Sequence, residues 1–225
     1  MQLNLSKISH PGSEIPNSDS IINIIFDFGG VICNIDIKRT EKKFFELGLE
    51  SGEDDYGATN FKGLFEALET GTIHPQEFRD RLRNFFLNPV TDEQLDDAWN
   101  ALLLDIPEPR IRLLENLRKD FRIFLLSNSN EIHYLKFLEN FRKQFGYSDF
   151  EALFEKTYFS FNLGFKKPSR EIFIHVLQNA GLNPSETLFI DDTLMHVEGA
   201  QALGIHAHYL QINQGEQIID LFTPA

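Results

Sequence analysis

Short apolar runs that each end at a polar residue constrain the fold of this chain more than any other feature. Four of them are IINIIFD (21–27), FRIFLLS (121–127), KTYFS (156–160) and TLFID (187–191), and a weaker fifth is HAHYL (206–210). Runs of this length that are rich in Ile, Phe and Leu are typical of strands buried on both faces. They therefore predict the strands of a parallel sheet.

Helical patterns separate these runs. The segment PRIRLLENLRK (109–119) has its apolar residues on one face, just before the second run. The segment SREIFIHVLQNA follows Pro168 and stops at Gly181. A proline and a capping serine at the start, with a glycine at the end, are boundary signals of a helix. The alternation predicts an α/β fold, a Rossmann-like parallel sheet with helices on both faces.

Residues 36–105 interrupt this alternation, because they contain helical patterns but no convincing strand. The clearest patterns are FKGLFEALETG (61–71), PQEFRDRLRNFF (75–86) and DEQLDDAWNALLL (92–104). We interpret this stretch as a small helical cap inserted after the first strand. Residues 21–35 and 106–225 then form the α/β core. Residues 1–20 are polar and contain two prolines and a glycine, so we expect a flexible leader there.

Charge, cysteine count and hydropathy exclude several classes of protein. The formal net charge of −13 repels nucleic-acid phosphates and anionic membrane surfaces. A small anionic substrate stays compatible, because a local cation outweighs a diffuse negative field. Cys33 is the one cysteine in the sequence, so an intrachain disulfide and a thiolate metal cage are both excluded. The sequence has no signal-peptide pattern and no apolar run of about 18 residues, so we expect a cytoplasmic protein.

Polar residues close several of the predicted strands. In an open parallel sheet, ligands bind beyond the carboxyl ends of the strands, and that rule selects Asp27, Ser127 and the pair Asp191 and Asp192. Lys167, in the loop before a helix, adds an ammonium group. Carboxylates without cysteine or paired histidine are ligands for a hard cation, above all Mg²⁺. Such a metal, with lysine and serine left for phosphate oxygens, predicts phosphoryl transfer on a small phosphorylated molecule.

Four segments resemble the motifs of the haloacid dehalogenase (HAD) superfamily. FDFGGVI (26–32) resembles the first motif, LLSNSN (125–130) the second, LGFKKP (163–168) the third and FIDD (189–192) the fourth. Their order, their strand-end placement and the insert after the first motif are similar to a HAD protein with the first type of cap. The sequence GGV after the first aspartate and the segment SNSNEIH are also similar to the subgroup that includes the α-D-glucose-1-phosphate phosphatases.

This resemblance implies a nucleophile and a metal site. Asp27 is expected to attack phosphorus and form an aspartyl-phosphate. The backbone carbonyl of Gly29 and the carboxylates of Asp27 and Asp192 are expected to bind Mg²⁺, with Asp191 as a direct or water-mediated ligand.

The resemblance also implies a phosphate site. Ser127 and the backbone amide of Asn128 are expected to hold phosphate oxygens. Lys167 is expected to neutralise charge on the nucleophile and on the transferred group, because the lysine of the family immediately precedes a proline, here Pro168. Lys166 is its rival by residue type.

Two positions depart from the family pattern. HAD phosphatases usually carry a second aspartate two residues after the nucleophile, which protonates the leaving oxygen, but this position is Gly29. Losing a general acid costs about 10²–10⁴ in rate. The loss matters least for a good leaving group, such as the anomeric oxygen of a sugar 1-phosphate. His196 stands where the subgroup usually has asparagine, either as a simple polar replacement, as a group that tunes the metal ligands or as a substitute base.

We therefore expect Mg²⁺-dependent hydrolysis of a phosphomonoester, with a sugar phosphate as substrate. One alternative is a dehalogenase, which uses the same nucleophile without metal. Another is a regulatory protein that lost turnover because Gly29 replaces the acid. Structural explanations compete as well: Ser127 is also placed to cap the following helix, and Asp27 to cap a turn.

Overall fold

The structure is a computed structural model that describes residues 1–8, 20–49, 58–146 and 149–223. Its centre is a five-stranded parallel sheet in the order β4-β3-β2-β5-β6. The strands are β2 (Asn23–Phe26), β3 (Arg122–Ser127), β4 (Lys156–Phe159), β5 (Thr187–Asp191) and β6 (His206–Tyr209). The predicted α/β fold and all five predicted strands are confirmed.

Strand β2 lies at the point where the chain changes direction across the sheet. From β2 the chain moves outward through β3 to β4, and it then returns to the other side of β2 to add β5 and β6. The loops after β2, β3 and β5 therefore leave the same edge of the sheet next to one another. Ligands bind at such a switch point in open α/β sheets.

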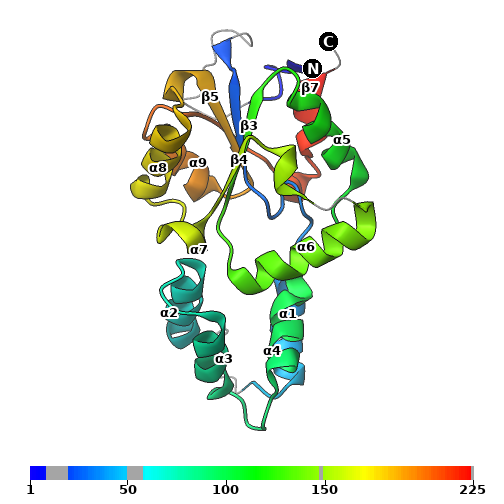
Figure 1. The fold of residues 1–225 in the computed structure, drawn as a ribbon, viewed down its shortest axis with the longest axis vertical. Helices are drawn as coiled ribbons and strands as arrows, with labels where there is room; N and C mark the ends of the chain where they lie inside the picture. The colour runs from blue at the N-terminus through cyan, green and yellow to red at the C-terminus, as the bar shows by residue number, and fades with distance from the viewer. Residues whose placement is uncertain (9–19, 50–57, 147–148, 224–225) are drawn as a thin grey trace.

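Both faces of the sheet are covered by helices, as the strand–helix alternation predicts (Figure 1). Helices α5 (Glu108–Leu117) and α6 (Glu131–Phe145) pack on one face, and α8 (Arg170–Ala180) and α9 (Leu194–Gln201) pack on the other. Alternate residues of β2 show the division, since Ile24 belongs to the first core and Ile25 to the second. Among the described residues, helices are too short or too polar to cross a bilayer.

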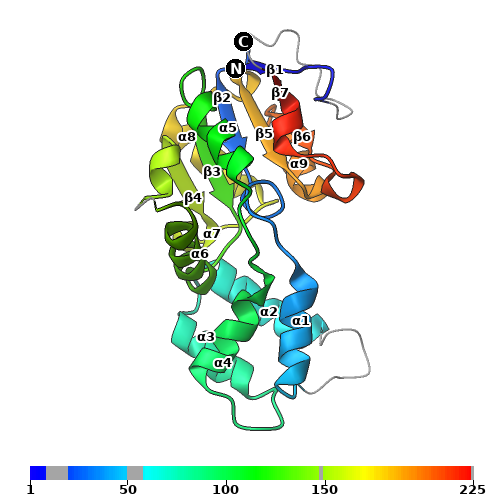
Figure 2. The ribbon, with the colours of Figure 1, turned by 90° about the vertical axis from the view of Figure 1, so that its right-hand side faces the viewer.

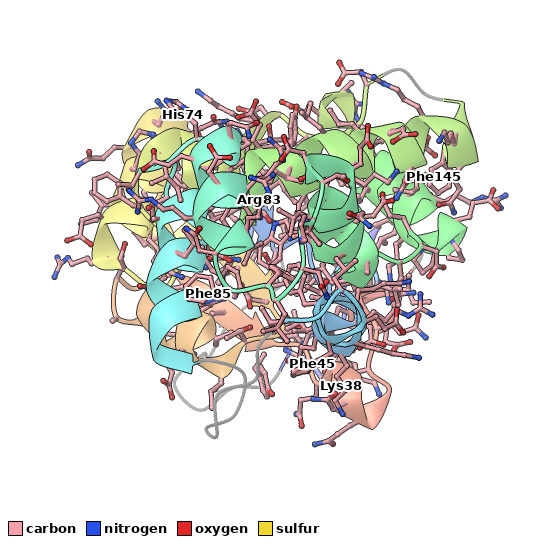
Figure 3. All side chains as sticks on the ribbon, turned by 90° about the horizontal axis from the view of Figure 1, so that it is seen from below. Lys38, Phe45, His74, Arg83, Phe85 and Phe145 are labelled. Atoms are coloured by element: carbon pink, nitrogen blue, oxygen red, sulfur yellow. The ribbon has the colours of Figure 1, made fainter. Side chains whose placement is uncertain are left out.

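A second group of helices extends away from the carboxyl edge of the sheet (Figures 1 and 2). It contains α1 (Ile37–Glu46), α2 (Ala58–Glu69), α3 (Pro75–Arg83), α4 (Asp92–Trp99) and the 3₁₀ turn η3 (Asn100–Leu102). These helices have an apolar core of their own, built around Phe44, Phe78 and Trp99. Seen from below, they lie across the end of the sheet (Figure 3). We call this group the cap; its division from the core at residues 36 and 105 is a proposal.

Two adjacent chain segments connect the cap to the core, and we call them the hinge. Ile35 and Leu103 form an antiparallel bridge. The N–H of Asp36 donates to the carbonyl of Leu102 (2.9 Å), and the N–H of Leu104 donates to the carbonyl of Asn34 (3.0 Å). Entry and exit of the inserted chain are therefore held side by side.

The cap also contacts the core away from the hinge. The ring of Trp99 stacks on His133 of α6 at 4.8 Å, and His133 Nδ1 donates to Asn100 Oδ1 (2.9 Å). Burial lowers the pKa of His133 to about 3, so this imidazole is neutral. On the other side, the Nζ of Lys166 lies 2.8 Å from Glu69 Oε2 of α2. The first contact is uncharged, and the second is ionic.

The N-terminal residues correct one prediction. Strand β1 (Gln2–Leu3) pairs with β7 (Phe222–Thr223), and Leu3 and Ile8 are buried in the main core. The expectation of a flexible leader is therefore wrong for residues 1–8, because two apolar side chains in a polar segment are enough to dock it. Residues 9–19 lie outside the described residues.

Short elements complete the chain, and sequence patterns did not indicate them. They are α7 (Ser160–Leu163), η4 (Glu151–Leu153), η5 (Pro184–Glu186), η6 (Ile212–Gln214) and η7 (Ile218–Leu221). The serine that was expected to cap α8, Ser169, occupies the N-cap position, but its side chain makes no capping hydrogen bond.

Candidate active site

Three carboxylates converge at the switch point of the sheet. Asp27 directly follows β2, Asp191 is the last residue of β5, and Asp192 comes next. The register places Asp27 level with Asp191, because Phe26 pairs with Ile190 and the N–H of Asp27 donates to the carbonyl of Ile190 (2.9 Å). One ligand oxygen from each of the three carboxylates lies within 4.8 Å of the others.

Lys167 brings the positive charge into this cluster. Its Nζ donates to Asp27 Oδ1 at 2.6 Å and to Asp191 Oδ2 at 2.7 Å, and the residue is only 1% exposed. Asn128 fixes its backbone from both sides: Asn128 Nδ2 donates to the Lys167 carbonyl (2.9 Å), and the Lys167 N–H donates to Asn128 Oδ1 (2.8 Å). A side chain from the end of β3 therefore positions the lysine.

Lys166 points elsewhere. It binds the cap at Glu69, with Glu66 at 3.6 Å, so it does not enter the carboxylate cluster. Of the two adjacent lysines, the one beside Pro168 is in the site, as the position of the proline indicates.

Asp191 is the most fully satisfied of the three acids. Besides Lys167, it accepts from the Thr193 N–H (2.8 Å), and His196 Nδ1 lies 3.0 and 3.1 Å from its two oxygens. Burial raises the pKa of Asp191, but Lys167 and His196 outweigh burial and hold this pKa at about 2. Asp191 therefore stays ionised, with both oxygens already bonded.

Asp27 and Asp192 behave in the opposite way. Burial, opposed by Lys167 and reinforced by the charge of Asp191, raises the pKa of Asp27 to about 7. Burial and Asp191 raise the pKa of Asp192 to about 6. Three carboxylates and one ammonium leave two uncompensated negative charges when all are ionised. A buried divalent cation would balance them, so the donor set fits a hard metal ion.

The loop after β2 is shaped around Asp192. Gly30 has φ +79°, and a Cβ on it would lie 2.2 Å from Asp192 Oδ2. A side chain at position 30 is excluded by both its backbone conformation and the carboxylate beside it. Gly29 differs, because the atoms nearest to a Cβ there belong to the Ile35 side chain, with Cδ1 at 3.1 Å. The position of the usual acid is therefore covered by an apolar side chain.

Ser127 and Asn128 lie at the end of β3, beside the carboxylates. Ser127 is buried, and its Oγ has one weak contact, 3.5 Å from the Asn128 carbonyl oxygen. The explanation of Ser127 as a helix cap is wrong, because Asn130 caps α6 by accepting from the His133 N–H (3.0 Å). The Ser127 hydroxyl is thus free of a capping role. The Asn128 side chain is taken up by Lys167, which leaves its backbone amide.

Comparison with known proteins places the chain among enzymes of one kind. The family model described as haloacid dehalogenase-like hydrolase matches residues 23–204. A D-ribitol-5-phosphate phosphatase of Bacteroides thetaiotaomicron is 32% identical over 189 residues, which span 82% of this chain and 89% of that protein. A sesquiterpene phosphatase of Aspergillus oryzae is 40% identical over 185 residues, 80% of this chain and 85% of that one.

Solved structures agree with these matches. A HAD family enzyme from Bacteroides thetaiotaomicron, in complex with magnesium and inorganic phosphate, superposes with a TM-score of 0.81 and 38% identity. The superposition covers 90% of this chain and 100% of that one. A HAD-like hydrolase from Porphyromonas gingivalis superposes with a TM-score of 0.75 and 33% identity, over 84% of this chain and 90% of that one.

Proposed function

The chain belongs to the haloacid dehalogenase-like hydrolases, and from that premise we propose that it is a Mg²⁺-dependent phosphatase of small phosphorylated metabolites. One observation carries the proposal. Three acids and a buried lysine meet at the switch point of the sheet, with two negative charges left for a divalent cation. The phosphatase relatives and the magnesium and phosphate bound to a relative support it.

In this proposal Asp27 attacks phosphorus, the ester P–O bond breaks and the alcohol leaves. Water then hydrolyses the aspartyl-phosphate, which releases inorganic phosphate and restores the Asp27 carboxylate. The carboxylates of Asp27 and Asp192 and the carbonyl of Gly29 would hold Mg²⁺. Asp191 would act through water, since Lys167, Thr193 and His196 already occupy its oxygens. When bound, the metal supplies charge compensation that keeps Asp27 ionised and polarises the phosphoryl group.

The phosphoryl oxygens would be held by the Ser127 hydroxyl, the Asn128 backbone amide and Lys167. The ammonium of Lys167 already lies 2.6 Å from the attacking carboxylate, so it orients the nucleophile before substrate arrives. After transfer, the same ammonium can compensate the charge of the phosphorylated aspartate. Asp27, Ser127 and Asn128 lie at strand ends, and Lys167 lies in a loop that Asn128 holds in place. This arrangement favours a rigid phosphate site.

For the leaving group we propose a sugar or polyol, in keeping with the D-ribitol-5-phosphate phosphatase relative. Because Gly29 offers no acid, an anomeric phosphate, as in the α-D-glucose-1-phosphate phosphatases, is the sugar phosphate that needs least help. The regulatory alternative, a pocket that binds without turnover, rests on that same glycine.

An apolar alcohol is the second candidate for the leaving group. Four of the exposed large apolar side chains, Ile37, Phe165, Leu194 and Met195, lie within three residues of Ile35, Lys167 or Asp192. They would contact an apolar chain that leaves the phosphate site toward the cap. The sesquiterpene phosphatase relative supports this candidate.

The test is phosphate release from a panel of phosphomonoesters with Mg²⁺. The panel contains ribitol 5-phosphate, glucose 1-phosphate, farnesyl phosphate and p-nitrophenyl phosphate. We expect turnover that EDTA abolishes and that Asp27→Asn lowers by about 10⁴-fold or more while the fold persists. Turnover of a haloacid in EDTA would support the dehalogenase, and binding without any turnover would support the regulator. We also propose a cytoplasmic protein that does not bind nucleic acid, because the net charge of −13 repels phosphate backbones.

A further inference from the structure

A cavity borders the loop that follows β2, which carries the first motif. Its volume is about 500 Å³. The lining residues come from the first-motif loop, the hinge, the start of α5 and the loop that follows β6. They include Gly30, Asn34, Leu104, Arg110, Glu216 and Gln217. Asp27, Ser127, Lys167, Asp191 and Asp192 do not line it, so this cavity is separate from the candidate active site.

Arg110 places a positive charge in the wall of the cavity without a salt-bridge partner among the described residues. The residue is only 6% exposed, yet it forms no salt bridge within 4.0 Å to any carboxylate of the described residues. Its Nη1 donates to the Ile32 carbonyl (3.2 Å) and to Asn34 Oδ1 (3.0 Å). Its Nε has no hydrogen-bond partner among the described residues, and Nη2 has none there either. Buried guanidinium groups are ordinarily paired.

The acid in the wall of the cavity is already bonded elsewhere. Glu216 Oε1 lies 3.1 Å from His208 Nε2, and Glu216 Oε2 accepts from the Gln211 N–H at 2.8 Å. The nearby Asp105 accepts from Asn34 Nδ2 (3.0 Å) instead of from the guanidinium. Asn34 thus stands between the arginine and the closest acid of the hinge. The Nη2 group of Arg110 therefore remains for an outside ligand.

We propose that this cavity binds a small oxyanion, a phosphate or a carboxylate, on Arg110. A guanidinium with unpaired N–H groups matches the paired oxygens of such anions. The occupant would lie against Asn34 and Leu104, which belong to the two segments of the hinge, and against Gly30, which lies beside Asp192. The site would therefore bind a free anion next to the hinge between core and cap. This inference does not depend on the phosphatase activity.

Inorganic phosphate in excess EDTA is the probe that isolates this site. Without metal, the three acids of the active site repel phosphate, so binding there is suppressed. We expect saturable binding by titration calorimetry, with a dissociation constant on the order of 1 mM, and chemical-shift changes at Asn34, Leu104 and Gln217. Arg110→Met should weaken binding at least tenfold. Arg112→Met is the matched control, because Arg112 lies on the same helix but is exposed and paired with Glu108, and it should bind phosphate like the native protein.

Selenate soaked into crystals of the native protein keeps the test independent of the folding of Arg110→Met. An anomalous peak beside Arg110 would support the proposal. No saturable binding by the native protein, undiminished binding by Arg110→Met, or selenate found only at other places would each overturn it.

Discussion

The two halves of the candidate site differ in where their residues come from and in how firmly those residues are held. The phosphate half consists of Asp27, Ser127, Lys167, Asp191 and Asp192, from strand ends or a loop fixed by one. Lys167 and Asp191 are both buried, and Lys167 donates hydrogen bonds to Asp27 and Asp191. Burial, charge pairing and backbone geometry together leave these groups few alternative positions.

The leaving-group half has the opposite character. It consists of Gly29, Ile35 and the exposed apolar residues Phe165, Leu194 and Met195, on loops and at the start of α9, and the cap faces it. The atom nearest to a Cβ added at position 29 would be the terminal methyl group of Ile35. From this comparison we propose that the sheet determines the reaction, whereas the loops and the cap determine which alcohol leaves. Substitutions in the phosphate half should abolish phosphoryl transfer to Asp27. Substitutions in the leaving-group half should change the relative activities toward different substrates.

After loss of the nucleophile itself, removal of the buried ammonium should have the largest effect. Lys167→Met leaves Asp27 and Asp191 without their shared cation, so we expect kcat to fall by about 10²–10³ with p-nitrophenyl phosphate. The adjacent Lys166→Met is the matched control. Lys166 binds Glu69 of the cap instead of the acids, so its loss should change KM more than kcat. Equal losses of kcat in the two variants would contradict the division into halves.

A methyl group at Gly30 should come next. The added Cβ would lie 2.2 Å from Asp192 Oδ2 at a backbone φ of +79°, so Asp192 must move away from its present position. We expect Gly30→Ala to weaken Mg²⁺ binding by about 10–100-fold, measured as the Mg²⁺ dependence of turnover. Gly146→Ala shares the positive φ (+70°) but meets nothing within 4 Å. It should lose some thermal stability and keep the native Mg²⁺ affinity.

Much of the phosphate half could be predicted from the sequence, and the reason is geometric. All strands of a parallel sheet end at the same edge, so residues that follow buried strands lie near one another. The positions of Asp27, Ser127, Asp191 and Asp192 in the sequence therefore predict that they lie together. Lys167 is distinguished from Lys166 only by the resemblance to the HAD motif, in which the lysine immediately precedes a proline. The five strands were predictable because short apolar runs of this length are typical of buried strands.

Other contacts were not predictable, because they depend on packing between distant segments. The bonds from His196 to Asp191 require the start of α9 to turn back over β5. The cover of Ile35 over Gly29 requires the path of the hinge. The docking of Leu3 rests on a two-residue strand pair between the two ends of the chain. No local pattern in the sequence encodes these three arrangements.

The charge imbalance of the phosphate half predicts a pH-dependent response to metal. Asp27 and Asp192 have folded-state pKa values of about 7 and 6, above the ordinary 3.8. Without metal, the folded state binds more protons than the unfolded state between about pH 4 and 7, so its stability falls as pH rises through that window. Mg²⁺ competes with these protons and should stabilise the protein more at pH 8 than at pH 5.

Thermal unfolding with and without saturating Mg²⁺ measures this difference. At 100 times the dissociation constant, binding contributes about 2.7 kcal/mol, which corresponds to roughly 5–10 °C for a chain of this size. The Mg²⁺-induced shift should shrink toward zero at pH 5. In Asp192→Asn the shift should be small at both pH values. A native shift that is the same at pH 5 and pH 8 would show that these acids do not hold the metal.

The smallest effect should come from giving the leaving-group half the acid that it lacks. The backbone at Gly29 accepts a side chain, but a Cβ there would press on Ile35 Cδ1 at 3.1 Å. Gly29→Asp alone should therefore change kcat/KM by less than about tenfold, and the double variant Gly29→Asp with Ile35→Ala should gain more. Ile35→Ala alone separates the effect of the added space from the effect of the added acid.

The gain must depend on the alcohol, because p-nitrophenolate leaves without protonation whereas the primary alkoxide of ribitol does not. A rise in kcat/KM for ribitol 5-phosphate with no rise for p-nitrophenyl phosphate would identify position 29 as the vacant place of the acid. An equal rise for both esters would mean that the substitution acts by reshaping the site, and the contrast between the two halves would then lose its chemical basis.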